Sequence, residues 1–343
     1  MYLNHFGLND FPFRLSPDPD YLFISQGHAQ AKSYVDYSLL TRDGFVIITG
    51  DVGSGKTTLM RSLLVDWQDV ALVLHVEQTQ LTPLEFLQVV FFRLTGAAGS
   101  DNKVELLRDL TEALERAEAQ GMRVVLCIDE AQALTFEVLE ELRFLTALES
   151  GKDKLLSVIL MGQPELRQVL DAPGMEQLRQ RVRLRFHLSG LTVDEVSAYV
   201  IHRLRIAGAS RPDRIVAKDA WPVIHRYTGG IPRLINALCD MMFLRALVAD
   251  RRLIKADLVL EAAQELGWPE YSERQTSTVS ALPRGAVRAS RRGAAGEDGP
   301  EELLPALEQL DQRLANLDVS LRRIADALEH ANESTPARKR GAS

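Results

Sequence analysis

The sequence predicts an α/β fold: a parallel sheet with helices on both faces, a small all-helical domain after it, and a C-terminal coiled-coil helix. Four apolar runs, at 45–49, 71–76, 124–129 and 155–161, are rich in β-branched residues and separated by helical stretches. Runs of this kind are typical of parallel strands that are buried on both faces. From Thr192 onward the strand signal fades and apolar residues recur at helical spacing.

The chain divides into five predicted segments. Residues 1–188 hold an N-terminal segment and the α/β domain, and residues 189–268 form the helical domain, a lid. Residues 269–300 change to Pro, Gly, Ser, Ala and scattered Arg, which predicts a flexible linker. A heptad helix is expected at 301–331 and a disordered tail at 332–343.

Helices are expected both between the strands and in the lid. Two lie between strands, at 83–94 and 104–119, and the second stops just before Gly121. In the lid, Pro232 is expected at a helix start because proline suits the first helical position. The predicted lid helices span 192–207, 217–228, 231–249 and 255–266.

A leucine-rich seam near the C-terminus favours a coiled coil, because its spacings alternate between four and three residues. An isolated helix over residues 301–331 is only marginally stable, so it needs a partner: a second copy, another protein, or the α/β domain of its own chain. The seam is Leu303, Leu307, Leu310, Leu314, Leu317, Leu321, Ile324 and Leu328.

The linker contains several arginines. They fit a solvated segment, or contact with an acidic partner or lipid head groups. The arginines are Arg284, Arg288, Arg291 and Arg292.

Composition sets broad limits. The formal net charge of −7 argues against a generally nucleic-acid-binding surface, although it leaves room for a local basic patch. Cys127 and Cys239 lie in apolar runs, which predicts buried thiols rather than a disulfide. The N-terminus lacks a signal-peptide pattern, and no apolar run reaches the ~18 residues of a membrane span. We therefore expect a cytoplasmic protein without a transmembrane segment, and peripheral contact with the inner membrane stays open.

The region from Phe45 to Thr58 is predicted to be a phosphate-binding loop, because GDVGSGKT matches G-x-x-x-x-G-K-[ST] in full. A strand precedes the loop and a helix follows, so a bound phosphate would lie at a helix N-terminus. Lys56 would reach the β- and γ-phosphates and Thr57 would ligate Mg²⁺, which predicts ATP and Mg²⁺ as cofactors. The predicted binding residues are Gly50, Asp51, Val52, Gly53, Ser54, Gly55, Lys56, Thr57 and Thr58.

Two adjacent carboxylates, Asp129 and Glu130, end the third apolar run. Ligands bind at the C-terminal ends of strands in open α/β sheets, so this position suits a nucleotide site. Asp129 is the predicted Mg²⁺ ligand, and Glu130 would orient and polarise the attacking water. An ordinary turn start is the alternative.

Three further polar residues are candidates for contact with the transferred phosphate. Gln163 follows the fourth strand beside the expected γ-phosphate, unless it is only a turn residue. Arginines alternate at 179, 181 and 183, and Arg181 is our candidate for an arginine finger acting on a neighbouring subunit; a basic exposed strand would look the same. Arg233, in the first turn of a lid helix, would reach the nucleotide, unless it is a surface arginine.

The order of these motifs resembles an AAA+ ATPase. It runs from the phosphate loop through DEAQ (129–132), GQPEL (162–166) and LRQRV to GIPRLIN (231–237). The opening, FGLNDFPF followed by SPDPDYLFISQGHAQA, is most similar to the bacterial ExeA-like (general secretion pathway protein A) family. The resemblance covers roughly residues 1–268. It implies that Gln163 is the first sensor, Arg181 the finger and Arg233 the second sensor, with the adenine near Tyr21 to His28.

The resemblance also implies a function. Secretion-type members resemble a design with a membrane span and a periplasmic peptidoglycan-binding domain, whereas this chain has a linker and a heptad helix. It is closer to the subfamily associated with exosortase and exopolysaccharide loci, which implies an ATP-hydrolysing motor or switch in secretion or envelope assembly. An arginine that acts on a neighbouring subunit implies at least a dimer and commonly a ring of six. A protein partner, such as an inner-membrane assembly, is expected on the C-terminal helix. A DNA-associated ATPase of the transposition-helper type is the rival, and a nucleotide-gated scaffold is the third reading.

Overall fold

The computed structural model describes residues 1–16, 18–41, 45–150 and 153–274. The predicted heptad helix, the tail and the linker from residue 275 onward lie outside these ranges. The described residues belong to one compact unit. Among them, none of the helices has the length and apolarity needed to cross a membrane.

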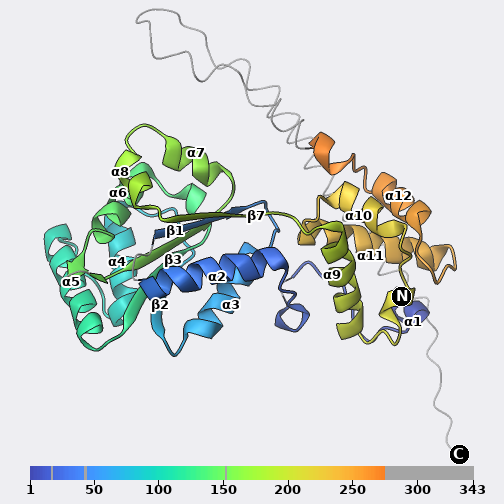
Figure 1. Ribbon diagram of the computed structural model, residues 1–343, viewed down its shortest axis with the longest axis horizontal. Helices are drawn as coiled ribbons and strands as arrows, with labels where there is room; N and C mark the ends of the chain where they lie inside the picture. Colours follow the sequence, from blue (N-terminus) through green and yellow to red (C-terminus); the bar gives the residue numbers. More distant parts are fainter. Residues whose placement is uncertain (17, 42–44, 151–152, 275–343) are drawn as a thin grey trace, which may run out of the picture. The chain divides into compact units, whose positions relative to one another are not determined.

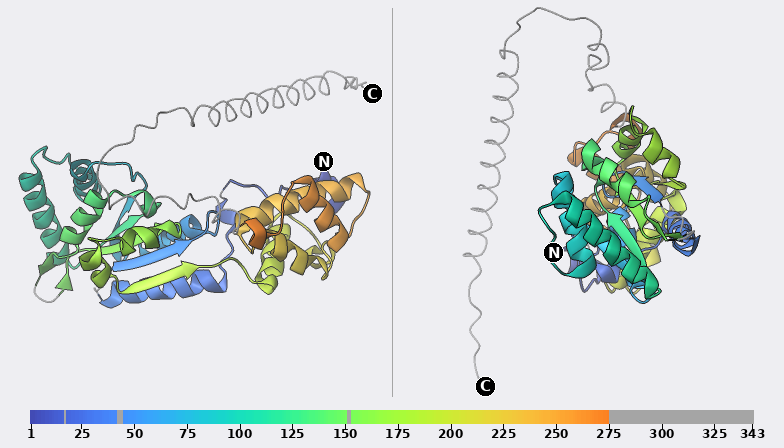
Figure 2. Two further views of the ribbon diagram at one scale, coloured as in Figure 1. Left: turned by 90° about the horizontal axis from the view of Figure 1, so that it is seen from above. Right: turned by 90° about the vertical axis from the view of Figure 1, so that its left-hand side faces the viewer.

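Five parallel strands form a sheet in the order β2-β3-β6-β1-β7. Figure 1 labels four of them, β1, β2, β3 and β7. The strand β7 lies beside β1 and runs in the same direction (Figure 2). It was missing from the sequence prediction because Arg185 and His187 interrupt its apolar pattern, as suits a strand at the edge of a sheet. The strands are β1 (Phe45–Gly50), β2 (Ala71–Val76), β3 (Arg123–Ile128), β6 (Ser157–Gly162) and β7 (Leu184–Leu188).

Helices cover both faces of the sheet because alternate residues of each strand point to opposite sides (Figure 1). In β1, Val46 and Ile48 pack against α2 and α3, while Phe45 and Ile47 face the core that α4 to α8 complete. A two-stranded ribbon, β4 (Glu149–Ser150) with β5 (Asp153–Lys154), lies apart from the sheet. The helices are α2 (Gln26–Thr41), α3 (Lys56–Trp67), α4 (Pro83–Thr95), α5 (Lys103–Ala119), α6 (Phe136–Leu145), α7 (Glu165–Asp171) and α8 (Glu176–Arg181).

Four further α-helices follow the sheet in the described part of the chain. The first of them begins with a capping box, in which Thr192 and Glu195 satisfy each other's backbone amides. Pro232 occupies the first turn of α11, as expected. The helices are α9 (Val193–Ile206), α10 (Ala220–Thr228), α11 (Pro232–Val248) and α12 (Ala256–Glu265).

The N-terminal segment packs into the core of the helical domain, although the sequence analysis grouped it with the α/β domain. The rings of Tyr2, Phe6 and Phe13 surround Phe243 of α11, with centroids 4.6–5.6 Å apart. The helix α1 (Tyr2–Phe6) thus belongs to the helical domain. Aromatic rings that bury together in this way stabilise a tertiary contact that no local sequence pattern reports.

The predicted boundary of the linker at residue 269 is too early. Residues 271–274 form a helical turn, and Tyr271 donates a hydrogen bond to Asp51 in the phosphate loop. The composition of this segment suggested a solvated chain, but Tyr271 and Arg274 attach it through hydrogen bonds to Asp51 and Tyr227.

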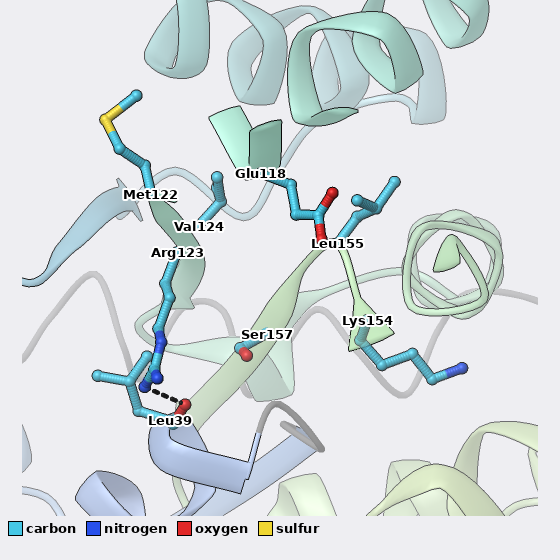
Figure 3. Close-up of a pocket in the computed structure, with 8 residues that line it drawn as sticks. All are labelled: Leu39, Glu118, Met122, Arg123, Val124, Lys154, Leu155 and Ser157. Carbon is cyan, nitrogen blue, oxygen red and sulfur yellow. Dashed lines mark hydrogen bonds between the residues drawn. The ribbon is translucent and has the colours of Figure 1, made fainter. Parts of the chain in front are cut away.

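A small cavity lies at the N-terminal end of the strands. A cavity of about 20 Å³ lies between the starts of β3 and β6, which is space for about one water molecule (Figure 3). Arg123 borders it and donates from Nη1 to the carbonyl oxygen of Leu39 at 2.8 Å, which fixes the end of α2 to β3. A nucleotide-sized cavity occurs instead where the strands end.

Candidate nucleotide-binding site

The phosphate loop connects β1 to α3, and two of its glycines have left-handed backbones. Gly53 has φ of 80° and Gly55 has φ of 103°, values that residues with a Cβ rarely adopt. Space is also restricted: a Cβ would come 2.5 Å from Arg233 Cβ at Gly53, and 2.5 Å from His28 Nε2 at Gly55. Glycine is therefore required both by the loop conformation and by its contacts with the lid and the N-terminal segment.

Lys56 is buried in this loop, with 6% of its surface exposed. Its Nζ donates to the carbonyl oxygens of Gly50 at 2.7 Å and Asp51 at 3.0 Å. Burial lowers the pKa of Lys56, while the nearby carboxylates of Glu130 and Asp129 oppose that shift. The ammonium group of Lys56 is thus bound by two neutral carbonyl oxygens of the loop. The oxygens of a phosphate group can replace them as hydrogen-bond acceptors.

Thr57 and Asp129 meet although they are 72 residues apart. The Thr57 hydroxyl donates to Asp129 Oδ2 at 3.0 Å, and the carboxylate also accepts from the Glu130 amide at 2.9 Å. Hydroxyl and carboxylate oxygens suit Mg²⁺, which usually takes one or two protein ligands beside substrate phosphates. Across the described ranges, no set of three or more His, Cys, Asp or Glu forms a complete cation cage. The residues present therefore fit Mg²⁺ held together with a nucleotide.

Glu130 lies next to this pair in a left-handed backbone conformation, with φ of 51°. Its Oε2 accepts from Gln132 Nε2 at 2.6 Å and from Gln163 Nε2 at 3.2 Å. Burial alone would raise the pKa of Glu130, but the two amide donors and the charge of Lys56 together hold it below its usual value. The carboxylate is therefore ionised at neutral pH and is directed by two glutamines.

Gln132 is the residue that the sequence reasoning missed. Its side-chain oxygen accepts from the backbone amide of Gln163 at 2.9 Å, while its nitrogen donates to Glu130. A single amide group thus connects the end of β3 with the end of β6. The sequence could have indicated Gln132 through its place in DEAQ, two residues after Glu130. Its side-chain amide has both a donor group and an acceptor, so it can bond two partners at once.

The lid reaches the phosphate loop through Arg233. Its backbone amide donates to the Gly53 carbonyl oxygen at 3.4 Å, and its aliphatic carbons lie against Gly53. Arg233 lines the same cavity as Lys56 and Thr57. Its position agrees with the expected one, and its role as a sensor stays a prediction.

A cavity of about 970 Å³ lies along the phosphate loop. Part of its wall is the segment from Tyr21 to His28 where the resemblance implied adenine. His28 is 4% exposed, burial lowers its pKa, and its Nδ1 lies 2.6 Å from Ser25 Oγ. The wall includes Lys56, Thr57, Thr58 and Glu130 of the α/β domain, Tyr21, Leu22, Phe23 and His28 of the N-terminal segment, and Tyr199, Arg203, Arg233 and Asn236 of the lid.

Arg181 lies outside this cavity. Arg181 is the last residue of α8. The alternative interpretation, that the alternating arginines belong to an exposed basic strand, is therefore wrong at this position. Its Nη1 donates to the Arg143 carbonyl oxygen and, at 3.0 Å, to Thr146 Oγ1. Arg179 lies 3.8 Å from Asp171. In its own chain Arg181 thus connects α8 to the end of α6, and a role on a neighbouring subunit stays a prediction.

Comparisons with known proteins agree with this architecture. Residues 40–170 match the family model described as an AAA domain. The chain is 39% identical over 284 residues to general secretion pathway protein A of Aeromonas hydrophila, covering 82% of this chain and 52% of that protein. The chain therefore spans about half the length of this curated relative.

Two solved structures are similar in fold. The ORC2 protein of Aeropyrum pernix, described as ADPNP–ADP complexes, has a TM-score of 0.54 at 20% identity, covering 80% of this chain and 75% of that one. Cdc6p from Pyrobaculum aerophilum has a TM-score of 0.51 at 15% identity, covering 73% and 71%. At these identities the likeness shows the fold alone.

The sheet, the phosphate loop and the helical lid define a P-loop NTPase of the AAA+ class. Within that class, the chain belongs to the ExeA-like family of AAA+ ATPases. The predicted parallel sheet of a P-loop NTPase and the resemblance are therefore confirmed. The role of the helical domain as a lid stays a prediction, and the C-terminal coiled coil falls outside the described residues.

Proposed function

We propose that this protein binds ATP with Mg²⁺ and hydrolyses it. The observation that carries the proposal is the 3.0 Å contact between Thr57 Oγ1 and Asp129 Oδ2. This contact joins the phosphate loop to the carboxylate pair Asp129 and Glu130. Lys56, Thr57 and Glu130 border the same cavity. A triphosphate on the loop would thus have a cation, a metal-binding pair and an ionised carboxylate around it.

Each side chain has a distinct role in this proposal. Lys56 exchanges the carbonyl oxygens of Gly50 and Asp51 for phosphate oxygens. Thr57 and Asp129 hold Mg²⁺, which when bound neutralises charge on the phosphate oxygens. Glu130 orients the attacking water and accepts its proton.

We further propose that ATP turnover drives a motor or switch in secretion or in envelope and exopolysaccharide assembly. The support is the name of the 39% identical relative, general secretion pathway protein A. In this proposal the protein is cytoplasmic, acts as a homo-oligomer in which Arg181 reaches a neighbouring site, and contacts an inner-membrane partner through its C-terminal helix.

Phosphate release tests the activity. The full chain is expected to release phosphate from ATP with Mg²⁺ and to stop when EDTA removes the metal. Electrophoretic mobility shifts at low salt, with and without ATP, test the rival function. Tight ATP-dependent retention of DNA would favour the transposition-helper reading over export.

Gln132→Ala is expected to lower kcat about tenfold to 100-fold with little change in KM, because a hydrogen bond to a charged group is lost. The pH profile should also change. Donation from Gln132 lowers the pKa of Glu130, so its removal raises that pKa. The pH below which hydrolysis falls should then move upward from its place below the usual glutamate range, and steady-state rates from about pH 3.5 to 7 measure it.

Gln168→Ala is the matched control, because this glutamine is exposed on α7. It should keep both the rate and the pH profile of the wild type. A Gln132→Ala enzyme with an unshifted acid limb and an unchanged kcat would mean that Gln132 does not position Glu130.

A further inference from the structure

Tyr271 lies in the segment that the sequence assigned to the linker, yet it contacts the phosphate loop. Its hydroxyl donates to Asp51 Oδ2 at 2.7 Å, across 220 positions of sequence. A neutral hydroxyl that donates to a carboxylate makes a charge-assisted hydrogen bond, which is stronger than a neutral one. This contact ties the chain that follows the lid to the second residue of the loop.

Several contacts hold the segment around Tyr271 in place. Glu270 lies 3.5 Å from Arg226, and the Arg274 guanidinium lies 4.7 Å from the centre of the Trp268 ring. Arg274 also donates to the carbonyl oxygen of Tyr227. Residues 268–274 are therefore attached to the C-terminal end of α10 on both sides of Tyr271.

Gly229 provides the space for the Tyr271 ring. This glycine ends α10 in a left-handed conformation, with φ of 58°. A Cβ there would lie 2.2 Å from Tyr271 Cδ1, so the ring rests on the bare backbone. The next residue, Gly230, accepts from the Leu191 amide at 2.8 Å, at the point where the sheet connects to the lid. Tyr271 therefore contacts both the phosphate loop, at Asp51, and the turn at Gly229 that lies next to the connection between the sheet and the helical domain.

Asp51 poses an electrostatic problem for a loop that binds a polyanion. Its carbonyl oxygen accepts from the Ser54 amide at 3.1 Å and from Lys56 Nζ at 3.0 Å, so its backbone is part of the phosphate-binding turn. A carboxylate facing the phosphates would repel them. The carboxylate is held by the Tyr271 hydroxyl, and neither Asp51 nor Tyr271 is among the described residues that line the large cavity.

We propose that Tyr271 is a positioning residue for the phosphate loop. It holds the Asp51 carboxylate away from the phosphates and fixes the loop turn, which makes residues 268–274 part of the nucleotide site. The proposal rests on the nucleotide binding proposed above, and it does not depend on hydrolysis.

A double-mutant cycle on nucleotide affinity tests this role. Titration calorimetry of the full chain with MgADP should show Tyr271→Phe binding about fivefold to tenfold more weakly than wild type, since the unrestrained Asp51 carboxylate would then repel the phosphates. In an Asp51→Asn background there is no carboxylate to restrain. There, adding Tyr271→Phe should change the Kd by less than about twofold.

Tyr34→Phe is the matched control, because Tyr34 lies on α2 and its hydroxyl accepts from Gln30 of the same helix. It should bind MgADP as the wild type does, and thermal unfolding should confirm that each variant is folded. An unchanged Kd for Tyr271→Phe would overturn the proposal, and so would an equal loss in both backgrounds, which indicates packing alone. If the wild type bound neither MgADP nor MgATP, the proposed function itself would be wrong.

Discussion

Glu130→Gln is expected to lower the steady-state rate of phosphate release at least about 100-fold while ATP binding persists. The amide has the size of the carboxylate, so its oxygen can still accept from Gln132 and Gln163. It has no charge and cannot take a proton from the attacking water. A coupled phosphate assay at saturating MgATP measures the loss.

Glu115→Gln provides the control, because this glutamate is exposed on α5. Its rate should match that of the wild type. Equal rates for the wild type and Glu130→Gln would show that the catalytic carboxylate lies elsewhere.

Lys56→Ala is expected to weaken MgADP binding by about 100-fold, because a buried cation that pairs with phosphate contributes several kcal/mol. The melting temperature of the free protein should change less, since Lys56 Nζ donates to neutral carbonyl oxygens of Gly50 and Asp51 there. Calorimetric titration measures the affinity, and the melting temperature without nucleotide checks the fold.

Lys255→Ala, at an exposed position before α12, tests for a general effect of removing positive charge. It should retain wild-type affinity. If Lys56→Ala also retained it, the loop would not hold the phosphates as proposed.

The parallel sheet and the phosphate loop were predictable because their signals are local. Buried strands read as short apolar runs, and the loop requires glycine at fixed positions beside Lys56 and Thr57. The edge strand β7 was not predictable in this way, because Arg185 and His187 alternate with its apolar residues. The other edge strand, β2, was predictable because its run ALVLHV has only one polar residue.

The contacts that complete the site come from distant parts of the chain. Tyr2 and Phe13 pack into the helical domain, and Tyr271 reaches Asp51, without any sequence pattern that marks the partner. Gln132 was visible in DEAQ, but its two hydrogen bonds depend on how β3 and β6 end side by side. Pairing of this kind follows from the tertiary fold and cannot be read from local spacing.

The identity of the nucleotide that stays on the protein tests the central claim most directly. Each protein is incubated with MgATP, desalted rapidly and denatured, and the released nucleotide is identified by chromatography. The account predicts ADP on the wild type, ATP on Glu130→Gln and no nucleotide on Lys56→Ala. The same nucleotide on the wild type and Glu130→Gln, or none on either, would contradict an ATP-hydrolysing site at this loop.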